Sequence, residues 1–272
     1  MPTVGLGVYK SVPGDETYTA VLSALGLGYR HIDTAQVYGN EADVGRAVRD
    51  SGIPRGQVFV TSKVWRDNYG YDSGLASIQS SVERVGLGYL DLMLLHAPGD
   101  PARREGAWRA LEEAVKQASN RARNLFWVAP GLVRSIGVSN FSQAHLEKLQ
   151  RMAVVQPAIE VTPFLQRKEL VSFCQGAGIV VQAYSPLSKG AKLADPTVVG
   201  VAQRLGVTPA QVMIRWSLQH GLVPLPKSTN PGRQATNLDV HSFELDSEAM
   251  AELDALEEGL VTGWDPIKND PV

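Results

Sequence analysis

Four side chains in this sequence can together protonate a carbonyl oxygen. Asp33 ends the second apolar run and Tyr38 follows it by five residues. Lys63 lies near the end of the third run, and His96 ends the fourth. A tyrosine with the usual pKa of about 10 is a weak proton donor at neutral pH. A lysine ammonium beside it stabilises tyrosinate and lowers this pKa, a carboxylate holds the ammonium, and an imidazole can polarise the carbonyl. The set therefore predicts general-acid catalysis of C=O reduction.

Each of the four also has a structural interpretation when it is taken alone. An aspartate at a strand end is commonly a helix cap, and Lys63 beside Trp65 is compatible with a surface charge. His96 lies between apolar neighbours, as core histidines do, and Tyr38 can simply pack its ring. Catalysis is favoured only because all four are expected to lie together at one edge of the fold.

The segments that carry these residues alternate between short apolar runs and amphipathic stretches. Strands are predicted at Val4–Tyr9, Tyr29–Thr34, Val58–Val64, Leu90–His96, Val133–Ser139, Val154–Val161, Ile179–Tyr184 and Leu222–Pro226. Helices are predicted at Thr17–Leu25, Glu41–Asp50, Asp72–Val85, Ala107–Gln117, Gln143–Arg151, Lys168–Gln175, Pro196–Leu205 and Pro209–His220. This α/β pattern favours a single (β/α)8 (TIM) barrel over residues 1–272, with functional residues at the carboxyl ends of its strands.

Residues typical of helix ends support these boundaries. Ser142 and Thr208 are predicted N-caps, the second followed by proline. Left-handed residues are predicted just past the helix ends at Gly26, Gly52, Gly86, Gly176, Gly206 and Gly221.

Composition excludes several classes of function. Lys and Arg number 26 and Asp and Glu 28, a net charge of −2, which argues against a general nucleic-acid or anionic-membrane binder. Cys174 is the only cysteine and the five histidines show no HExxH pattern, so no metal site is predicted. The sequence shows neither a secretory signal nor an apolar run of about 18–20 residues. We expect a cytoplasmic monomer.

Two segments depart from the regular pattern. The stretch Ala118–Gly131, with Phe126 and Trp127, lies between a predicted helix and strand that barrels join with about two to six residues. A surface lobe, an interaction loop and a sequence error are all compatible with it. Residues 259–272 form a C-terminal tail.

Six motifs, in order along the chain, resemble the aldo-keto reductase family. They are GYRHIDTAQVYGNE (28–41), TSKVW (61–65), LDLMLLHAP (90–98), RSIGVSNF (134–141), VVQAYSPL (180–187) and PLPKSTNPGR (224–233). The resemblance extends from about Pro2 to Trp264, and the ending GLVTGWDP is similar to xylose-reductase-like and fungal members.

The resemblance implies a metal-free barrel that reduces aldehydes or ketones by hydride transfer from NADPH. It implies that Tyr38 is the general acid, that Lys63 and Asp33 tune it, and that His96 orients the carbonyl. The cofactor residues that it implies are Ser139 and Asn140 for the carboxamide, Tyr184 for stacking on nicotinamide, Ser185, Pro186 and Leu187 near the pyrophosphate, Lys227, Ser228 and Arg233 for the 2′-phosphate, and Asn237 for adenine.

The segment that begins at Lys227 also predicts a phosphate site on physical grounds. Lys227, Ser228, Thr229 and Arg233 offer charge-assisted and hydroxyl donors to a phosphate. Asn230-Pro231 predicts the start of a short helix, whose N-terminus favours an anion. A solvated basic turn is the alternative. No GxGxxG follows the first strand, so a Rossmann site is not indicated, and use of NADH remains open.

Three features depart from the family pattern. Pro157 and Ala158 stand where Asn-Gln is usual, which leaves one carboxamide contact unassigned. Thr236 stands where a glutamate near the adenine is common. The N-terminal hairpin plug of the barrel is missing from the sequence pattern.

Aromatic residues are predicted around a substrate pocket. Tyr9 follows the first strand, Trp65 follows the lysine, and Trp264 in the tail can close the site, together with His96. Such walls suit small, partly apolar carbonyl compounds, although rim packing explains Tyr9 and Trp65 equally well. We expect an open pocket with broad specificity.

Two other interpretations of the sequence remain open. A regulatory or interaction subunit on the same barrel would use the Phe126–Trp127 segment to bind a partner. A degenerate product that does not fold stably is the second.

Overall fold

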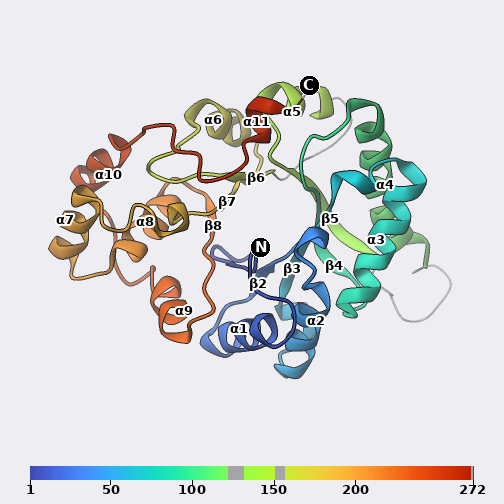
Figure 1. Ribbon diagram of the computed structural model, residues 1–272, viewed down its shortest axis with the longest axis horizontal. Coiled ribbons are helices and arrows are strands. Elements are labelled where there is room, and N and C mark those ends of the chain that lie inside the picture. Colours follow the sequence, from blue (N-terminus) through green and yellow to red (C-terminus); the bar gives the residue numbers. More distant parts are fainter. Residues whose placement is uncertain (122–131, 151–156, 271) are drawn as a thin grey trace.

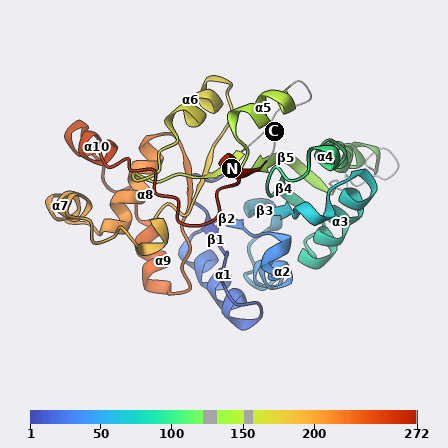
Figure 2. The ribbon, with the colours of Figure 1, turned by 45° about the horizontal axis from the view of Figure 1, so that its top comes forward.

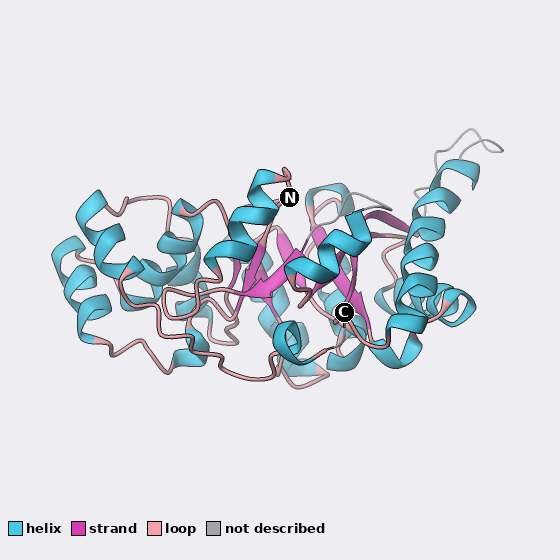
Figure 3. Cartoon of the chain, turned by 90° about the horizontal axis from the view of Figure 1, so that it is seen from above, coloured by secondary structure: helices cyan, strands magenta, loops and turns pink. Residues whose placement is uncertain are grey.

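Eight parallel strands form the inner layer of the protein. The computed structural model describes residues 1–121, 132–150, 157–270 and 272. The strands are β1 (Leu6–Gly7), β2 (His31–Asp33), β3 (Phe59–Val64), β4 (Leu90–Leu95), β5 (Val133–Ser139), β6 (Pro157–Glu160), β7 (Gln182–Tyr184) and β8 (Val223–Leu225). Their order in the sheet follows their order in the chain. Helices surround them (Figures 1 and 3), which confirms the predicted (β/α)8 barrel class.

The outer layer consists of helices that follow the strands. They are α1 (Asp15–Leu27), α2 (Glu41–Asp50), α3 (Tyr71–Val85), α4 (Pro101–Arg121), α5 (Gln143–Gln150), α6 (Lys168–Gly176), α7 (Pro196–Leu205), α8 (Pro209–Gln219), α9 (Pro231–Leu238), α10 (Ser247–Asp254) and α11 (Pro266–Asn269). Short 3-10 turns are η1 (Gln36–Tyr38), η2 (Arg55–Gln57), η3 (Arg66–Asn68) and η4 (Ser188–Gly190). Each predicted strand and helix is present: β5, α2 and α7 have the predicted bounds, and the others have shifted ends. α10 and α11 were not predicted.

Two backbone hydrogen bonds join β8 to the first strand and close the barrel. The amide of Gly5 donates to the carbonyl of Pro224, and that of Gly7 to the carbonyl of Pro226, both at 3.0 Å. A Cβ on Gly5 would lie 2.6 Å from Cδ2 of Leu225, and one on Gly7 would lie 3.2 Å from the Leu225 carbonyl oxygen. Side chains are therefore excluded where the two strands approach.

Apolar side chains pack on both faces of the strands. Inside the barrel, Leu92, Leu94 and Ala158 pack with Phe59. The larger core lies between the strands and the helices and includes Ile32, Trp108 and Trp216. Burial on both faces explains why the strands appear in the sequence as nearly continuous apolar runs.

Helix ends largely follow the predicted signals. Thr208 accepts a hydrogen bond from the amide of Gln211, whose side chain accepts one from the Thr208 amide, so α8 begins with a capping box. Two glycine predictions were wrong: Gly26 and Gly176 lie within α1 and α6. The left-handed residues that follow these helices are Gly28 and Gly178. Each of these helices therefore ends one or two residues later than predicted, a common error in locating helix ends.

The irregular segments are described in part. α4 begins at Pro101 rather than Ala107 and includes the first residues of the predicted 118–131 insert, whereas residues 122–131, with Phe126 and Trp127, lie outside the described residues. β1 is the first element, and residues 1–5 form no hairpin. In Figure 2 the tail (dark red) crosses the barrel from α10 toward β5. None of the described helices has the length and apolarity to traverse a bilayer.

Candidate active site

One large cavity opens at the carboxyl ends of the strands. Its volume is about 1230 Å³, and the loops after the strands line it together with the C-terminal tail. Asp33, Tyr38, Lys63 and His96 all line it. The rim predicted from the sequence therefore exists, and its volume exceeds the roughly 300–1,000 Å³ of usual ligand pockets, leaving room for a dinucleotide and a substrate.

Lys63 and Asp33 form a buried ion pair at the base of the cavity. Their side chains are 3% and 6% exposed, and Nζ of Lys63 donates to Oδ1 of Asp33 at 2.7 Å. The same ammonium donates to the carbonyl of Thr34 at 2.9 Å. Burial raises the pKa of Asp33, and the adjacent ammonium opposes this shift. The two donated hydrogen bonds hold the ammonium in place.

Tyr38 is presented by a short turn beside this pair. Its turn, η1, ends at Gly39, which has a left-handed φ of 71°. The ring centroid of Tyr38 lies 5.2 Å from Nζ of Lys63 and 5.6 Å from the ring of His96. Burial, followed by the charge of Asp33, raises the pKa of Tyr38 well above 10. This direction is opposite to the lowering expected from Lys63, and it keeps the phenol protonated at neutral pH.

Gln36 anchors the turn that carries Tyr38. Its Oε1 accepts from the backbone amide of Trp65 at 2.9 Å, and its Nε2 donates to the side chain of Ser77 at 2.7 Å. These bonds tie η1 to the end of β3 and to α3. The tyrosine and the lysine are thus fixed relative to each other by backbone as well as by packing.

His96 is a neutral imidazole in this site. Burial, followed by the charge of Lys63, lowers its pKa well below 6.5. Its backbone amide donates to the carbonyl of Val64 at 3.0 Å, and its carbonyl accepts from Nδ2 of Asn140 at 2.9 Å. The centroids of the His96 and Trp65 rings lie 5.2 Å apart, with the two rings nearly perpendicular. A neutral ring held in this way can donate a hydrogen bond to a carbonyl oxygen without placing a second cation beside Lys63.

Ser139, Asn140 and Tyr184 form a hydrogen-bonded group on the opposite wall. The hydroxyl of Tyr184 donates to Oδ1 of Asn140 at 2.6 Å, and Nδ2 of Asn140 donates to Oγ of Ser139 at 3.0 Å. Asn140 has a left-handed φ of 66°, a conformation that asparagine tolerates better than most residues. The group connects three predicted cofactor residues with the backbone of His96.

The segment around Lys227 lies at the far end of the same cavity. Lys227 and Arg233 line the cavity, and within the described ranges neither side chain forms an ion pair. The side chain of Asn230 caps α9 and accepts from the amide of Arg233 at 3.0 Å. The predicted short helix is therefore present.

Most of the other predicted cofactor residues also face this cavity. Ser185, Pro186, Leu187, Ser228 and Asn237 line it, as does Thr236. Thr229 does not line it and is half-buried.

The C-terminal tail closes one side of the cavity, as was predicted from the position of Trp264. Its ring lies 6.2 Å from that of Trp65, and the guanidinium of Arg66 lies 5.3 Å from both rings. Tyr9, which also lines the cavity, packs 5.0 Å from the ring of Tyr38. The four predicted substrate residues therefore all line the same cavity.

Some lining residues were not predicted from the sequence. Glu160 on β6 accepts from the amide of Thr262 in the tail at 3.2 Å, and Nζ of Lys189 donates to the Thr262 carbonyl at 2.7 Å. These contacts join positions up to 102 residues apart. No local pattern signals them, although Glu160 within an apolar strand is itself unusual.

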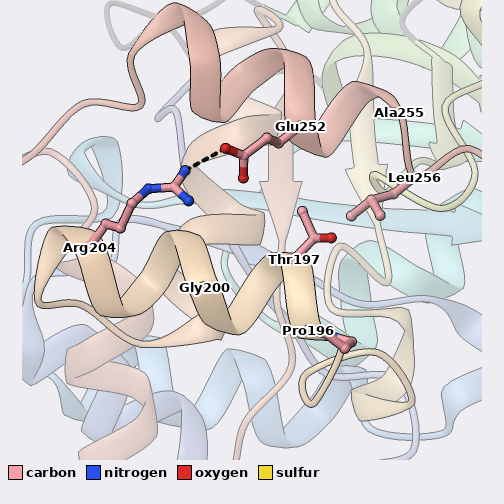
Figure 4. Close-up of a pocket in the computed structure, with 7 residues that line it drawn as sticks. All are labelled: Pro196, Thr197, Gly200, Arg204, Glu252, Ala255 and Leu256. Carbon is pink, nitrogen blue, oxygen red and sulfur yellow. Dashed lines mark hydrogen bonds and ion pairs between the residues drawn. The ribbon is translucent and has the colours of Figure 1, made fainter.

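A second cavity carries no comparable chemistry. It holds about 560 Å³ between α7 and α10, and its lining residues include Pro196, Thr197 and Leu256 (Figure 4). Its charged groups, Arg204 and Glu252, are paired with each other at 2.8 Å. Across the described ranges, no three His, Cys, Asp or Glu side chains gather as a metal site would require.

The barrel and this rim define an oxidoreductase of the (β/α)8 class. The aldo/keto reductase family model matches residues 3–258. The chain is 43% identical to an uncharacterized oxidoreductase, YtbE, of Bacillus subtilis, covering 98% of this chain and 92% of the relative. It is 41% identical to the glyoxal reductase of the same organism over 98% and 92% of the two chains.

A solved structure shows the same likeness in three dimensions. A Gox0644 variant in complex with NADPH matches with a TM-score of 0.88 and 39% identity, covering 100% of this chain and 95% of that one. The chain belongs to the aldo/keto reductase family. The predicted class, an NADP-dependent oxidoreductase that reduces carbonyl groups, is confirmed. The finer resemblance to fungal xylose-reductase-like members is not supported, because these two relatives are bacterial.

Proposed function

We propose that Tyr38 is the proton donor of this reductase. The observation that carries the proposal is the protonated phenol packed between the buried Lys63–Asp33 pair and the neutral ring of His96. His96 would hydrogen-bond the carbonyl oxygen of the substrate and direct it toward the phenol. As the proton leaves, the ammonium of Lys63 stabilises the phenolate that forms, and Asp33 keeps the ammonium in position.

The residues around the cavity fit NADPH as the reductant. Lys227 and Arg233 offer two cations without a protein partner in the described ranges, as the 2′-phosphate requires. Asn140 and Tyr184 present polar and aromatic surface beside the proton donor. Bound NADPH supplies the electron pair and the hydrogen that reduce the carbonyl carbon, while Tyr38 supplies the proton for its oxygen. The NADPH complex of the Gox0644 variant supports this assignment.

The substrate class follows from the walls of the cavity. Tyr9 and Trp264 are about half-exposed at the mouth, and Trp65 lies deeper beside His96. We propose small aldehydes and ketones that are partly apolar, with broad specificity, and the name of the glyoxal reductase relative supports a dicarbonyl among them. We further propose that residues 1–272 act as one barrel domain, as a monomer in the cytoplasm.

NADPH oxidation with 4-nitrobenzaldehyde tests the role of Tyr38. Tyr38→Phe removes only the hydroxyl, so NADPH should still bind while turnover falls by about 10²–10⁴-fold, the usual contribution of a general acid. Tyr18→Phe, which removes an exposed hydroxyl bonded to Asp50, should retain the wild-type rate. Wild-type turnover by Tyr38→Phe would refute the assignment.

The alternative of a regulatory subunit stays a prediction. It depended on Phe126 and Trp127, which lie outside the described residues.

A further inference from the structure

The turn that presents Tyr38 contributes no fully buried side chain to the core. None of the three residues of η1 is buried, and Val37 is 50% exposed. The residues on either side of the turn, Ala35 and Asn40, are buried, so η1 projects from the core as a short loop. A single 3-10 turn gains little stability from its own hydrogen bonds. Contacts outside the turn must therefore set its position relative to β3.

The side-chain amide of Gln36 supplies such contacts with all of its polar groups. Its Nε2 donates to the carbonyl and the hydroxyl of Ser77, at 3.1 and 2.7 Å, and to the hydroxyl of Ser81 at 2.9 Å. Its Oε1 accepts from the backbone amide of Trp65 at 2.9 Å and from Nδ2 of Asn68 at 3.1 Å. Because a glutamine amide has two N–H donors and an oxygen with two lone pairs, these bonds use its full capacity. One side chain thus ties η1 to α3 and to the end of β3.

A second tether starts at the other end of the same loop. Glu41, the first residue of α2, is 2% exposed. It accepts from the hydroxyl of Ser62 at 2.6 Å and from Nε of Arg84 at 2.7 Å. The same guanidinium donates through Nη2 to the hydroxyl of Ser81 at 3.0 Å, and Gln36 bonds this hydroxyl as well. The two tethers therefore belong to one polar network.

The two tethers reach β3 on both sides of Lys63. The second tether holds the residue directly before this lysine, and Gln36 holds the amide of Trp65, two residues after it. Tyr38 lies between the two tethers in the loop. The segment with the phenol is thus attached at both ends to the segment with the ammonium. This attachment fixes the ring centroid of Tyr38 at 5.2 Å from Nζ of Lys63.

We propose that Gln36 is a positioning residue that sets the reach of Tyr38 toward the carbonyl oxygen of the substrate. Gln36 does not itself line the cavity, so it acts through the turn. A displacement of a reacting group by about 1 Å can cost about 10²-fold in rate. The inference rests on the proposed function, because it needs Tyr38 as the proton donor. Loss of the Gln36 contacts should therefore slow the chemical step while the cofactor and the substrate still bind.

Gln36→Met tests this role, because it keeps the length of the side chain and removes its hydrogen bonds. With NADPH bound and 4-nitrobenzaldehyde saturating, the single-turnover rate should fall by about 10–100-fold. The aldehyde concentration for half-maximal rate and the dissociation constant of NADP⁺ should change by less than about threefold. A loss confined to the rate marks a contribution made in the transition state and not to binding.

Gln219→Met is the matched control. Oε1 of Gln219 accepts from the amide of Leu245 at 2.8 Å, and its Nε2 donates to the Leu245 carbonyl at 2.9 Å. This amide also joins two separate segments, but it lies at the end of α8 and outside the cavity lining. The control should lower the melting temperature, as Gln36→Met does, and retain the wild-type rate.

The Tyr38→Phe background shows whether Gln36 acts through the phenol. Adding Gln36→Met to Tyr38→Phe should lower the residual single-turnover rate by no more than about twofold, because the hydroxyl that Gln36 positions is already missing. Ser77→Ala with Ser81→Ala removes two of the acceptors of Gln36, and this variant replaces Gln36→Met if that protein does not fold. A wild-type rate in the variant used, or a full further loss in the Tyr38→Phe background, would overturn the inference and leave the proposed function intact. Wild-type turnover by Tyr38→Phe would instead contradict the proposed function.

Discussion

The ammonium of Lys63 lies 2.7 Å from a carboxylate oxygen of Asp33, and both side chains are almost completely buried. A pair of this kind gains little net stability, because each ion loses its hydration on folding. The phenol ring of Tyr38 lies 5.2 Å from the same ammonium. In a water-poor cavity, electrostatic stabilisation is stronger than in solvent. The pair is therefore better explained by the cation that it places beside Tyr38 than by a contribution to the stability of the fold.

Removing one member of this pair should destabilise the fold as well as the reaction. Lys63→Met leaves the carboxylate of Asp33 buried without its cation, and we expect a loss of about 3–5 kcal/mol in the free energy of unfolding. The double variant Lys63→Met with Asp33→Asn should recover most of this stability, while carbonyl reduction stays lost in both. Urea denaturation and NADPH oxidation measure the two effects. A double variant as unstable as Lys63→Met would contradict a buried charge as the cause.

His31 should make the protein sensitive to acid. It is fully buried below the catalytic rim, and burial lowers its pKa to about 3. Above pH 6.5 the imidazole is neutral in both the folded and the unfolded chain, so its titration costs no stability. Below pH 6.5 the unfolded chain binds a proton that the folded chain does not, and the contribution of this histidine to stability falls. The contribution declines by about 1.4 kcal/mol per pH unit between pH 6.5 and 3. His31→Leu should make the melting temperature fall less steeply with pH below pH 6, and exposed His241→Gln should not. Identical slopes for wild type and His31→Leu would refute it.

Closure of the barrel at Gly5 gives a test of packing. In Gly5→Ala the new Cβ would meet Leu225 at 2.6 Å and the ring of His31 at 2.8 Å. We expect a loss of about 1–3 kcal/mol in the free energy of unfolding from this overpacking. Gly26→Ala is the control, because its Cβ meets nothing within 4 Å in α1, and it should stabilise by about 0.5–1 kcal/mol. Thermal melting compares the two, and equal effects would show that strand closure tolerates a side chain.

The sequence was sufficient to predict the elements and the rim. β5 was predicted with the bounds that the structure shows, Val133–Ser139, because an apolar strand buried on both faces leaves a clear signal. Strand ends also located Asp33, Lys63 and His96, since parallel strands of a barrel end on one face.

Contacts between distant segments could not be predicted in this way. The bond between Thr262 and Glu160 joins residues 102 positions apart, and no periodicity encodes it. The pKa of Tyr38 is raised rather than lowered, first by burial and then by the charge of Asp33, and burial depends on the whole rim.

The preference for NADPH over NADH should depend on Lys227 and Arg233. Both side chains are exposed on the cavity, and neither is paired with an acid in the described part of the chain. Replacing either with glutamine removes one charge-assisted contact to a phosphate dianion, and about tenfold weaker NADPH binding is expected. NADH lacks the 2′-phosphate, so its dissociation constant should change by less than about twofold.

Salt and a distant control complete this test. Added salt should weaken NADPH binding to the wild type more than to either variant, because screening acts on the charges that were removed. Lys168→Gln, on the exposed start of α6, should leave both dissociation constants unchanged. Isothermal titration with the two cofactors gives the ratio directly. If Lys227→Gln and Arg233→Gln weakened NADH and NADPH equally, their side chains would be acting on the loop as a whole and not on the 2′-phosphate.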